Sequence, residues 1–193
     1  MSNSTSSGNV LKFSLAGGAP TTVASGLNSP SGLTFDAAGN LYIAEYGANQ
    51  VDKVAAGATS STVFATGLNE PYALTFNALG VLLESDEGSN TVNRISNTGV
   101  VTPFATTGLS SPLGLAFDGL GNYYEVNFAF TSTVNEISST GVVTPFAGGL
   151  NQANFLITTP VPVPEPSSLA LAATGLVTLA GSILRRRRAS AAR

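Results

Sequence analysis

The sequence repeats itself with a period of 41 residues, and no other feature constrains its fold so strongly. The segment Leu27–Asp36 returns as Leu68–Asn77 and again as Leu109–Asp118. Such a repeat indicates supersecondary units that stack on one another, because a single unit cannot bury its own apolar face. A proline, a phenylalanine and a Gly-Leu pair keep the spacing: Pro30, Pro71 and Pro112; Phe35, Phe76 and Phe117; and the pairs that begin at Gly26, Gly67, Gly108 and Gly149.

Each unit holds four short strand-like runs that alternate with turn signals. In the first unit the runs cover residues 32–35, 41–44, 51–54 and 62–65, and Asp36–Asn40 is the turn between the first two. The chain has 21 glycines and 10 prolines but only 10% charged residues, a composition that suits short strands and tight turns. Four antiparallel strands in one such unit form a blade of a β-propeller. The sequence therefore predicts an all-β fold.

The first unit resembles a known repeat family. Residues 30–51 read Pro-x-Gly-Leu-x-Phe-Asp-x-x-Gly-Asn-Leu-Tyr-x-Ala-Glu-x-x-x-Asn-x-Val, which is similar to the NHL repeat, a blade unit of six-bladed and related propellers. The resemblance implies three NHL-like units, at 28–68, 69–109 and 110–150. The second unit has Val81 in place of the turn asparagine, and the third departs further on its second strand.

The repeats begin and end with incomplete units. Residues 9–27 align with the outer half of a blade and residues 151–157 provide one more strand, so we expect a partial propeller of about three and a half blades. An open arc or a four-bladed closure would accommodate them. Residues 1–8 are expected to be disordered. Because they lack the basic start and apolar core of a signal peptide, the true start of the protein is expected upstream.

The composition changes at Thr158. Residues 158–166 form a proline-rich linker, since closely spaced prolines block both helices and central strands. Residues 167–184 carry no charge, and as a helix these 18 residues would be about 27 Å long, close to the thickness of a hydrocarbon core. The basic segment 185–193 follows. By the positive-inside rule, the sequence predicts one C-terminal transmembrane helix with a cytoplasmic tail and the propeller outside.

The parts of this tail occur in the order of a known sorting signal. A Pro-Glu-Pro motif precedes the apolar segment, and a cluster of arginines follows it. The tail resembles the PEP-CTERM signal of exopolysaccharide-producing Gram-negative bacteria. This resemblance implies cleavage by an exosortase, a membrane cysteine protease, followed by release or attachment at the cell surface. The alternative is a simple single-pass anchor whose prolines serve as a spacer. The residues concerned are Val163, Pro164, Glu165 and Pro166, and then Arg185, Arg186, Arg187 and Arg188.

The residue types that the sequence lacks exclude much chemistry. It has no histidine and no cysteine, which excludes disulfides, thiolate and imidazole metal sites, and acid–base schemes that need histidine. Residues 1–160 carry ten acidic and three basic residues, a net charge of −7. An acidic surface repels phosphate backbones, so we expect no nucleic-acid partner.

Polar side chains recur where the second strand of each unit ends. Glu45, Asp86 and Asn127 keep the 41-residue spacing, and oxygen ligands from neighbouring blades can hold calcium, as in the gluconolactonase-like propellers that the repeats resemble. In the other interpretation each side chain caps a turn by accepting hydrogen bonds from backbone amides. We predict this structural role and no cofactor. Together with Asp86, Glu84 and Glu87 are expected to lie on a solvated loop.

Two further sets of repeated residues are predicted to be structural. Asp36, Asn77 and Asp118 open the first hairpin of each unit, where such side chains bond to the backbone two residues further on. Six phenylalanines at fixed positions in the units are expected to pack between the sheets: Phe35, Phe64, Phe76, Phe104, Phe117 and Phe146.

Two classes of function remain. The prediction is an exported cell-surface or extracellular-matrix protein that is a binding or scaffold module and not an enzyme. Its partners would be an exosortase-type membrane protease, the membrane through residues 167–184, and an exopolysaccharide or another surface protein. The alternative is a fragment of a calcium-dependent gluconolactonase-like hydrolase, which would depend on Glu45 and Asp86.

Overall fold

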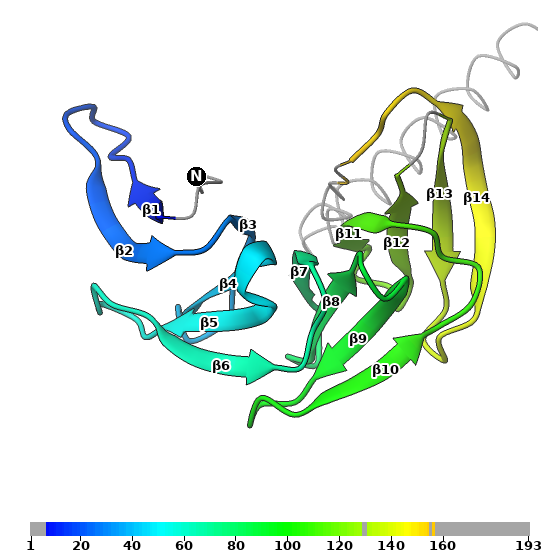
Figure 1. Ribbon diagram of the computed structural model, residues 1–193, viewed down its shortest axis with the longest axis horizontal. Coiled ribbons are helices and arrows are strands. Elements are labelled where there is room, and N and C mark those ends of the chain that lie inside the picture. Colours follow the sequence, from blue (N-terminus) through cyan, green and yellow to red (C-terminus); the bar gives the residue numbers. More distant parts are fainter. Residues whose placement is uncertain (1–6, 129–130, 155, 157–193) are drawn as a thin grey trace, which may run out of the picture. The chain divides into compact units, whose positions relative to one another are not determined.

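The computed structural model describes residues 7–128, 131–154 and 156, all within the first of the two units into which the chain divides. In this part every regular element is a β-strand except one 3₁₀ turn at Tyr46–Ala48 (Figure 1). The all-β prediction is therefore confirmed.

Several predictions from the sequence lie outside the described residues. They are residues 1–6 of the segment 1–8 that is expected to be disordered, the proline-rich linker, the transmembrane helix at 167–184 and the arginine cluster. Gly8, at the end of that first segment, instead begins the strand β1 (Gly8–Lys12). Among the residues that are described, no helix is long and apolar enough to cross a membrane.

Three four-stranded antiparallel sheets correspond to the three repeat units, and we call them blades 1, 2 and 3 (Figure 1). Blade 1 contains β3 (Pro30–Phe35), β4 (Leu41–Glu45), β5 (Gln50–Val54) and β6 (Thr62–Thr66). Blade 2 contains β7 (Pro71–Phe76), β8 (Leu82–Asp86), β9 (Thr91–Ile95) and β10 (Val101–Ala105). Blade 3 contains β11 (Pro112–Phe117), β12 (Tyr123–Asn127), β13 (Ser132–Ile137) and β14 (Val143–Leu150).

A two-stranded sheet precedes blade 1. Its strands, β1 (Gly8–Lys12) and β2 (Thr21–Leu27), pair antiparallel and correspond to the third and fourth strands of a blade. We call this sheet the half-blade. The strand expected within residues 151–157 is not formed by residues 151–154 and 156, the described part of that segment. A first strand of a blade pairs with the second strand of the same blade, and the sequence turns proline-rich before such a partner could follow.

The first strands of neighbouring blades lie against one another, β3 against β7 and β7 against β11. The approach of β3 to β7 is so close that a Cβ atom on Gly32 would lie 2.4 Å from the carbonyl oxygen of Tyr72. The hydroxyl of Ser31 also donates a hydrogen bond to that oxygen at 2.9 Å. Glycine is therefore required at position 32, because a side chain there would push the two blades apart.

The hairpin turns confirm the prediction made for their first residues. Each of these side chains accepts a hydrogen bond through Oδ1 from the backbone amide two residues further on. The distances are 3.0 Å for Asp36, 3.0 Å for Asn77 and 2.7 Å for Asp118. The turn that joins the first two strands is thus fixed by a local bond in all three blades.

The hydrophobic core consists of layers between consecutive sheets. Between blades 1 and 2, Tyr42, Val51 and Ala65 on one side pack with Leu74 and Ile95 on the other. Similar clusters lie between the half-blade and blade 1 and between blades 2 and 3. Blades 1 and 2 therefore each have one face buried against the preceding sheet and the other against the following one, and blade 3 has a face buried against blade 2.

The predicted burial of the six phenylalanines is correct for four of them. Phe64, Phe76, Phe104 and Phe117 pack against the clusters between the blades. Phe35 and Phe146 differ, with 63% and 61% of their surfaces exposed. Phe35 faces the half-blade, in which the described residues form only two strands, and Phe146 lies on blade 3, the last sheet of the described residues. The sequence position alone therefore predicted burial wrongly where the neighbouring blade is incomplete.

Candidate functional site

The structure places the three candidate oxygen ligands at the same position in successive blades, where the second strand ends. Each accepts a hydrogen bond from a backbone amide in the turn that leads into the first strand of its own blade. Asn28 donates to Glu45 Oε2 at 2.6 Å, Asn69 donates to Asp86 Oδ2 at 2.9 Å, and Ser110 donates to Asn127 Oδ1 at 2.7 Å. These side chains thus tie the second strand to the turn before the first.

The remaining oxygens of the two carboxylates also have partners. Gln50 Nε2 donates to Glu45 Oε1 at 3.0 Å, and the Ser89 amide donates to Asp86 Oδ1 at 3.2 Å. Burial raises the pKa of Glu45 and the pKa of Asp86, each above the usual value for its residue type. Within the described part of the chain, no three Asp or Glu side chains lie together in a group that could hold a metal ion. The arrangement is that of caps on a turn.

Glu84 corrects one expectation from the sequence. This residue and Asp86 both lie on β8 and are buried, Glu84 completely, so of the three acids expected on a solvated loop only Glu87 lies in a turn. Asn93 donates a hydrogen bond to Glu84 Oε2 at 3.0 Å. Burial, reinforced by the charge of Asp86, raises the pKa of Glu84 well above its usual value. Burial of Glu84 therefore favours its neutral, protonated form over the carboxylate.

Blade 3 repeats this arrangement one unit later. Glu125 is also completely buried, and Asn135 donates to its Oε2 at 2.9 Å. Burial raises the pKa of Glu125 to about 8. Within the described residues, the Oε1 atoms of Glu84 and Glu125 are buried and accept no hydrogen bond. Two buried acid–amide pairs therefore sit at equivalent places in blades 2 and 3.

The sequence contained a signal for these pairs that residue type obscured. Glu84 and Glu125 are 41 residues apart and occupy the strand position that Ile43 holds in blade 1. Since Ile43 is fully buried, the alternation along the strand places both glutamates on a buried face. Charged side chains are rarely buried, so their residue type alone predicted that both glutamates would lie at the surface.

Comparison with known proteins adds a finding on the tail. Residues 162–188 match the PEP-CTERM protein-sorting motif. The chain carries a PEP-CTERM sorting signal. This signal marks a protein for export and for sorting at the cell envelope by exosortase. A search of the curated proteins finds no match to the sequence.

Solved structures with similar folds are β-propeller proteins. A virginiamycin B lyase from Staphylococcus aureus has 17% identity over 79% of this chain and 53% of its own, with a TM-score of 0.64. A nidogen/laminin complex has 17% identity over 80% and 64%, with a TM-score of 0.70. A putative gluconolactonase has 19% identity over 70% and 53%, with a TM-score of 0.57. The chain thus spans less than two thirds of each, and at these identities the likeness concerns the fold alone.

Proposed function

We propose that this PEP-CTERM protein is a binding or scaffold module of the bacterial cell surface or extracellular matrix. The observation that carries the proposal is the sorting motif at residues 162–188, which follows directly after propeller blades. An exosortase-type protease of a Gram-negative bacterium would recognise Pro164-Glu165-Pro166, while the apolar segment holds the tail in the membrane. The blades would then act outside the cell, where an exopolysaccharide or another surface protein would be the partner.

The hydrogen bonds of the blades favour binding over catalysis. Glu45, Asp86 and Asn127 use their oxygens to hold turns, and the most buried acids, Glu84 and Glu125, lie between sheets away from solvent. A hydrolase would need a metal or a base that substrate can reach. A propeller that acts by binding needs only an exposed surface and a sorting signal, and this chain has both.

Sorting can be tested directly on the tail. In a host with an active exosortase, the mature protein is expected to lack the segment from about residue 167 onward, and Glu165→Ala should leave a full-length form in the membrane fraction. Intact-mass spectrometry of surface material measures both. The control is the same host without the protease. A wild-type protein that keeps its tail at the surface would mean that residues 158–193 are only an anchor.

Calcium binding separates the module from the hydrolase alternative. We expect no calcium-dependent rise in melting temperature, because both carboxylates already accept bonds from backbone amides, and binding to the folded state would have to raise that temperature by mass action. Differential scanning calorimetry with calcium and with a chelator measures the shift. A calcium-linked rise that disappears in Glu45→Ala would support the gluconolactonase-like hydrolase instead.

A further inference from the structure

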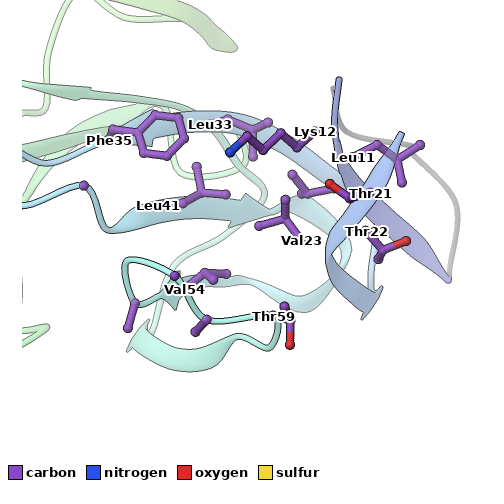
Figure 2. A pocket seen from close by; sticks show the side chains of 15 residues that line it. Leu11, Lys12, Thr21, Thr22, Val23, Leu33, Phe35, Leu41, Val54 and Thr59 are labelled. Atoms are coloured by element: carbon purple, nitrogen blue, oxygen red, sulfur yellow. The ribbon is translucent and has the colours of Figure 1, made fainter. Parts of the chain in front are cut away.

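A pocket of about 550 Å³ lies between the half-blade and blade 1. Its walls are apolar side chains from both sheets, with Val23 on one side and Leu33, Leu41 and Val54 on the other (Figure 2). Its volume falls within the range of small-molecule sites, which are mostly apolar with a few polar groups. Figure 2 shows the side chain of Lys12 reaching across the pocket toward Phe35.

The equivalent space between blades 1 and 2 is filled by aromatic rings. Tyr42 and Phe64 meet edge to face there, with ring centroids 4.9 Å apart. Phe76 from blade 2 packs against Tyr42 at 5.2 Å. The ammonium of Lys53 lies above this pair, 5.1 Å from the Tyr42 ring and 5.7 Å from the Phe64 ring. An aromatic cluster capped by a cation therefore closes this interface.

The interface between blades 2 and 3 also holds aromatic rings, but its tyrosine comes from the following blade. Tyr123 holds the place of Leu41, and Leu83 holds that of Tyr42. Phe104 packs on Tyr123 at 5.6 Å, and Phe117 lies 5.1 Å from Tyr123. The guanidinium of Arg94, which replaces Lys53 in this unit, lies 3.8 Å from the Phe104 ring centroid. Two successive interfaces thus hold aromatic rings under a basic side chain.

The pocket has the basic side chain of the other two interfaces but, among the described residues, no aromatic ring at the positions of Tyr42 and Phe64. Val23 occupies the position of Phe64 and Phe104, while Lys12 occupies that of Lys53. Phe35 occupies the position of Phe76, but 63% of its surface is exposed because no ring packs on it as Tyr42 packs on Phe76. The cation and the flanking phenylalanine are in place, and the apolar walls are formed.

The backbone at the rim shows the same difference. Gly99 and Gly141, in the last hairpins of blades 2 and 3, press against the preceding blade so closely that an added Cβ would lie 2.0 Å and 2.2 Å from its carbonyl oxygens. Gly57, in the last hairpin of blade 1, lines the pocket, and an added Cβ there would meet nothing within 4 Å. The half-blade interface is thus open where the other two are closed.

We infer that this pocket binds a planar aromatic ring that carries an anionic group. The ring of the ligand would occupy the place that Tyr42 and Phe64 fill in the next interface. Its edge would point toward Phe35, and its anionic group would lie near the ammonium of Lys12. Charge complementarity favours an anion, because Lys12 is the basic residue that lines the pocket. The inference goes beyond the proposed surface function. It depends only on the geometry of the half-blade and blade 1, so the sorting experiment and this one can fail independently.

Phenylacetate is a suitable probe, with cyclohexylacetate as the non-aromatic anion and benzylamine as the aromatic cation. Ligand-observed NMR on the full chain in a mild detergent, with a detergent blank, should show saturation transfer to phenylacetate and much less to the other two. Val23→Phe should abolish the signal, because it places the missing ring in the pocket. Lys12→Gln should weaken binding roughly 3- to 30-fold, as expected for the loss of a cation at a ring.

The matched control is Val63→Phe, which adds a ring at an exposed position of β6 outside the pocket and should leave binding unchanged. Circular dichroism shows whether each variant folds. If Val23→Phe fails to fold, the affinity of Lys12→Gln and the comparison of the three probes still test the inference. Equal binding of cyclohexylacetate, or unchanged binding to folded Val23→Phe, would overturn the inference. So would self-association that Val23→Phe abolishes, since the ring would then come from a second copy of the chain.

Discussion

Gly99→Ala is expected to destabilise the protein by about 3 kcal/mol or more, which is large for a single methyl group. Two costs add together. Gly99 has a φ of +82°, a conformation that an L side chain adopts with strain, and the new Cβ would lie 2.0 Å from the carbonyl oxygen of Phe64. Neither atom can move without shifting the hairpin of blade 2 away from blade 1. Urea unfolding followed by circular dichroism measures the loss.

Gly57→Ala is the matched control, because it separates the two costs. Gly57 has nearly the same φ, +80°, yet an added Cβ there meets nothing within 4 Å. Its replacement should cost only the conformational strain, about 1 to 2 kcal/mol. An added Cβ on Gly141 would lie 2.2 Å from the carbonyl oxygen of Phe104, so Gly141→Ala should behave like Gly99→Ala. Equal losses for Gly57→Ala and Gly99→Ala would mean that the blades adjust and that their close packing contributes little.

The repeat predicted the blades because its information is local and occurs three times. Each turn is fixed by a side chain that bonds two residues ahead, as Asp36 does, and each strand is bounded by such turns. Four strands per unit and their order therefore followed from the sequence. The partners of Glu45, Asp86 and Asn127 were more difficult to predict. Each side chain accepts a hydrogen bond from a backbone amide in a turn 17 residues earlier in the chain.

What the sequence could not predict depends on which sheet lies opposite. Phe35 and Phe76 are equivalent in the repeat, but only Phe76 meets a tyrosine from the preceding blade. Gly57 and Gly99 both lie in the last hairpin of their blade with nearly the same φ, and only Gly99 closely approaches the preceding sheet. A repeat pattern describes one blade. The contacts between blades depend on whether the neighbour is complete, and the pocket at the half-blade arises from that difference.

The stability of the protein should fall as the pH rises from about 4.5 to about 8, and Glu125→Gln should remove much of this fall. Burial raises the pKa of Glu125 from 4.5 to about 8, so the folded state favours the neutral acid. Below 4.5 the acid is protonated in both states, and the stability that Glu125 contributes is fully present. Between the two values the unfolded chain releases the proton first, which favours unfolding. The total loss is on the order of 5 kcal/mol.

Glutamine has the shape of the neutral acid and cannot ionise, so it keeps an oxygen that can accept the bond from Asn135 at every pH. Relative to the wild type, Glu125→Gln should therefore gain stability steadily between pH 5 and pH 8, as measured by urea unfolding at each pH. Glu136→Gln, at a partly exposed position on β13 of the same blade, is the control and should follow the wild type. Glu84→Gln should act in the same direction as Glu125→Gln, because burial raises the pKa of Glu84 in the same way. Parallel pH profiles for wild type and Glu125→Gln would show that the buried carboxyl titrates normally and that blades 2 and 3 admit water to it.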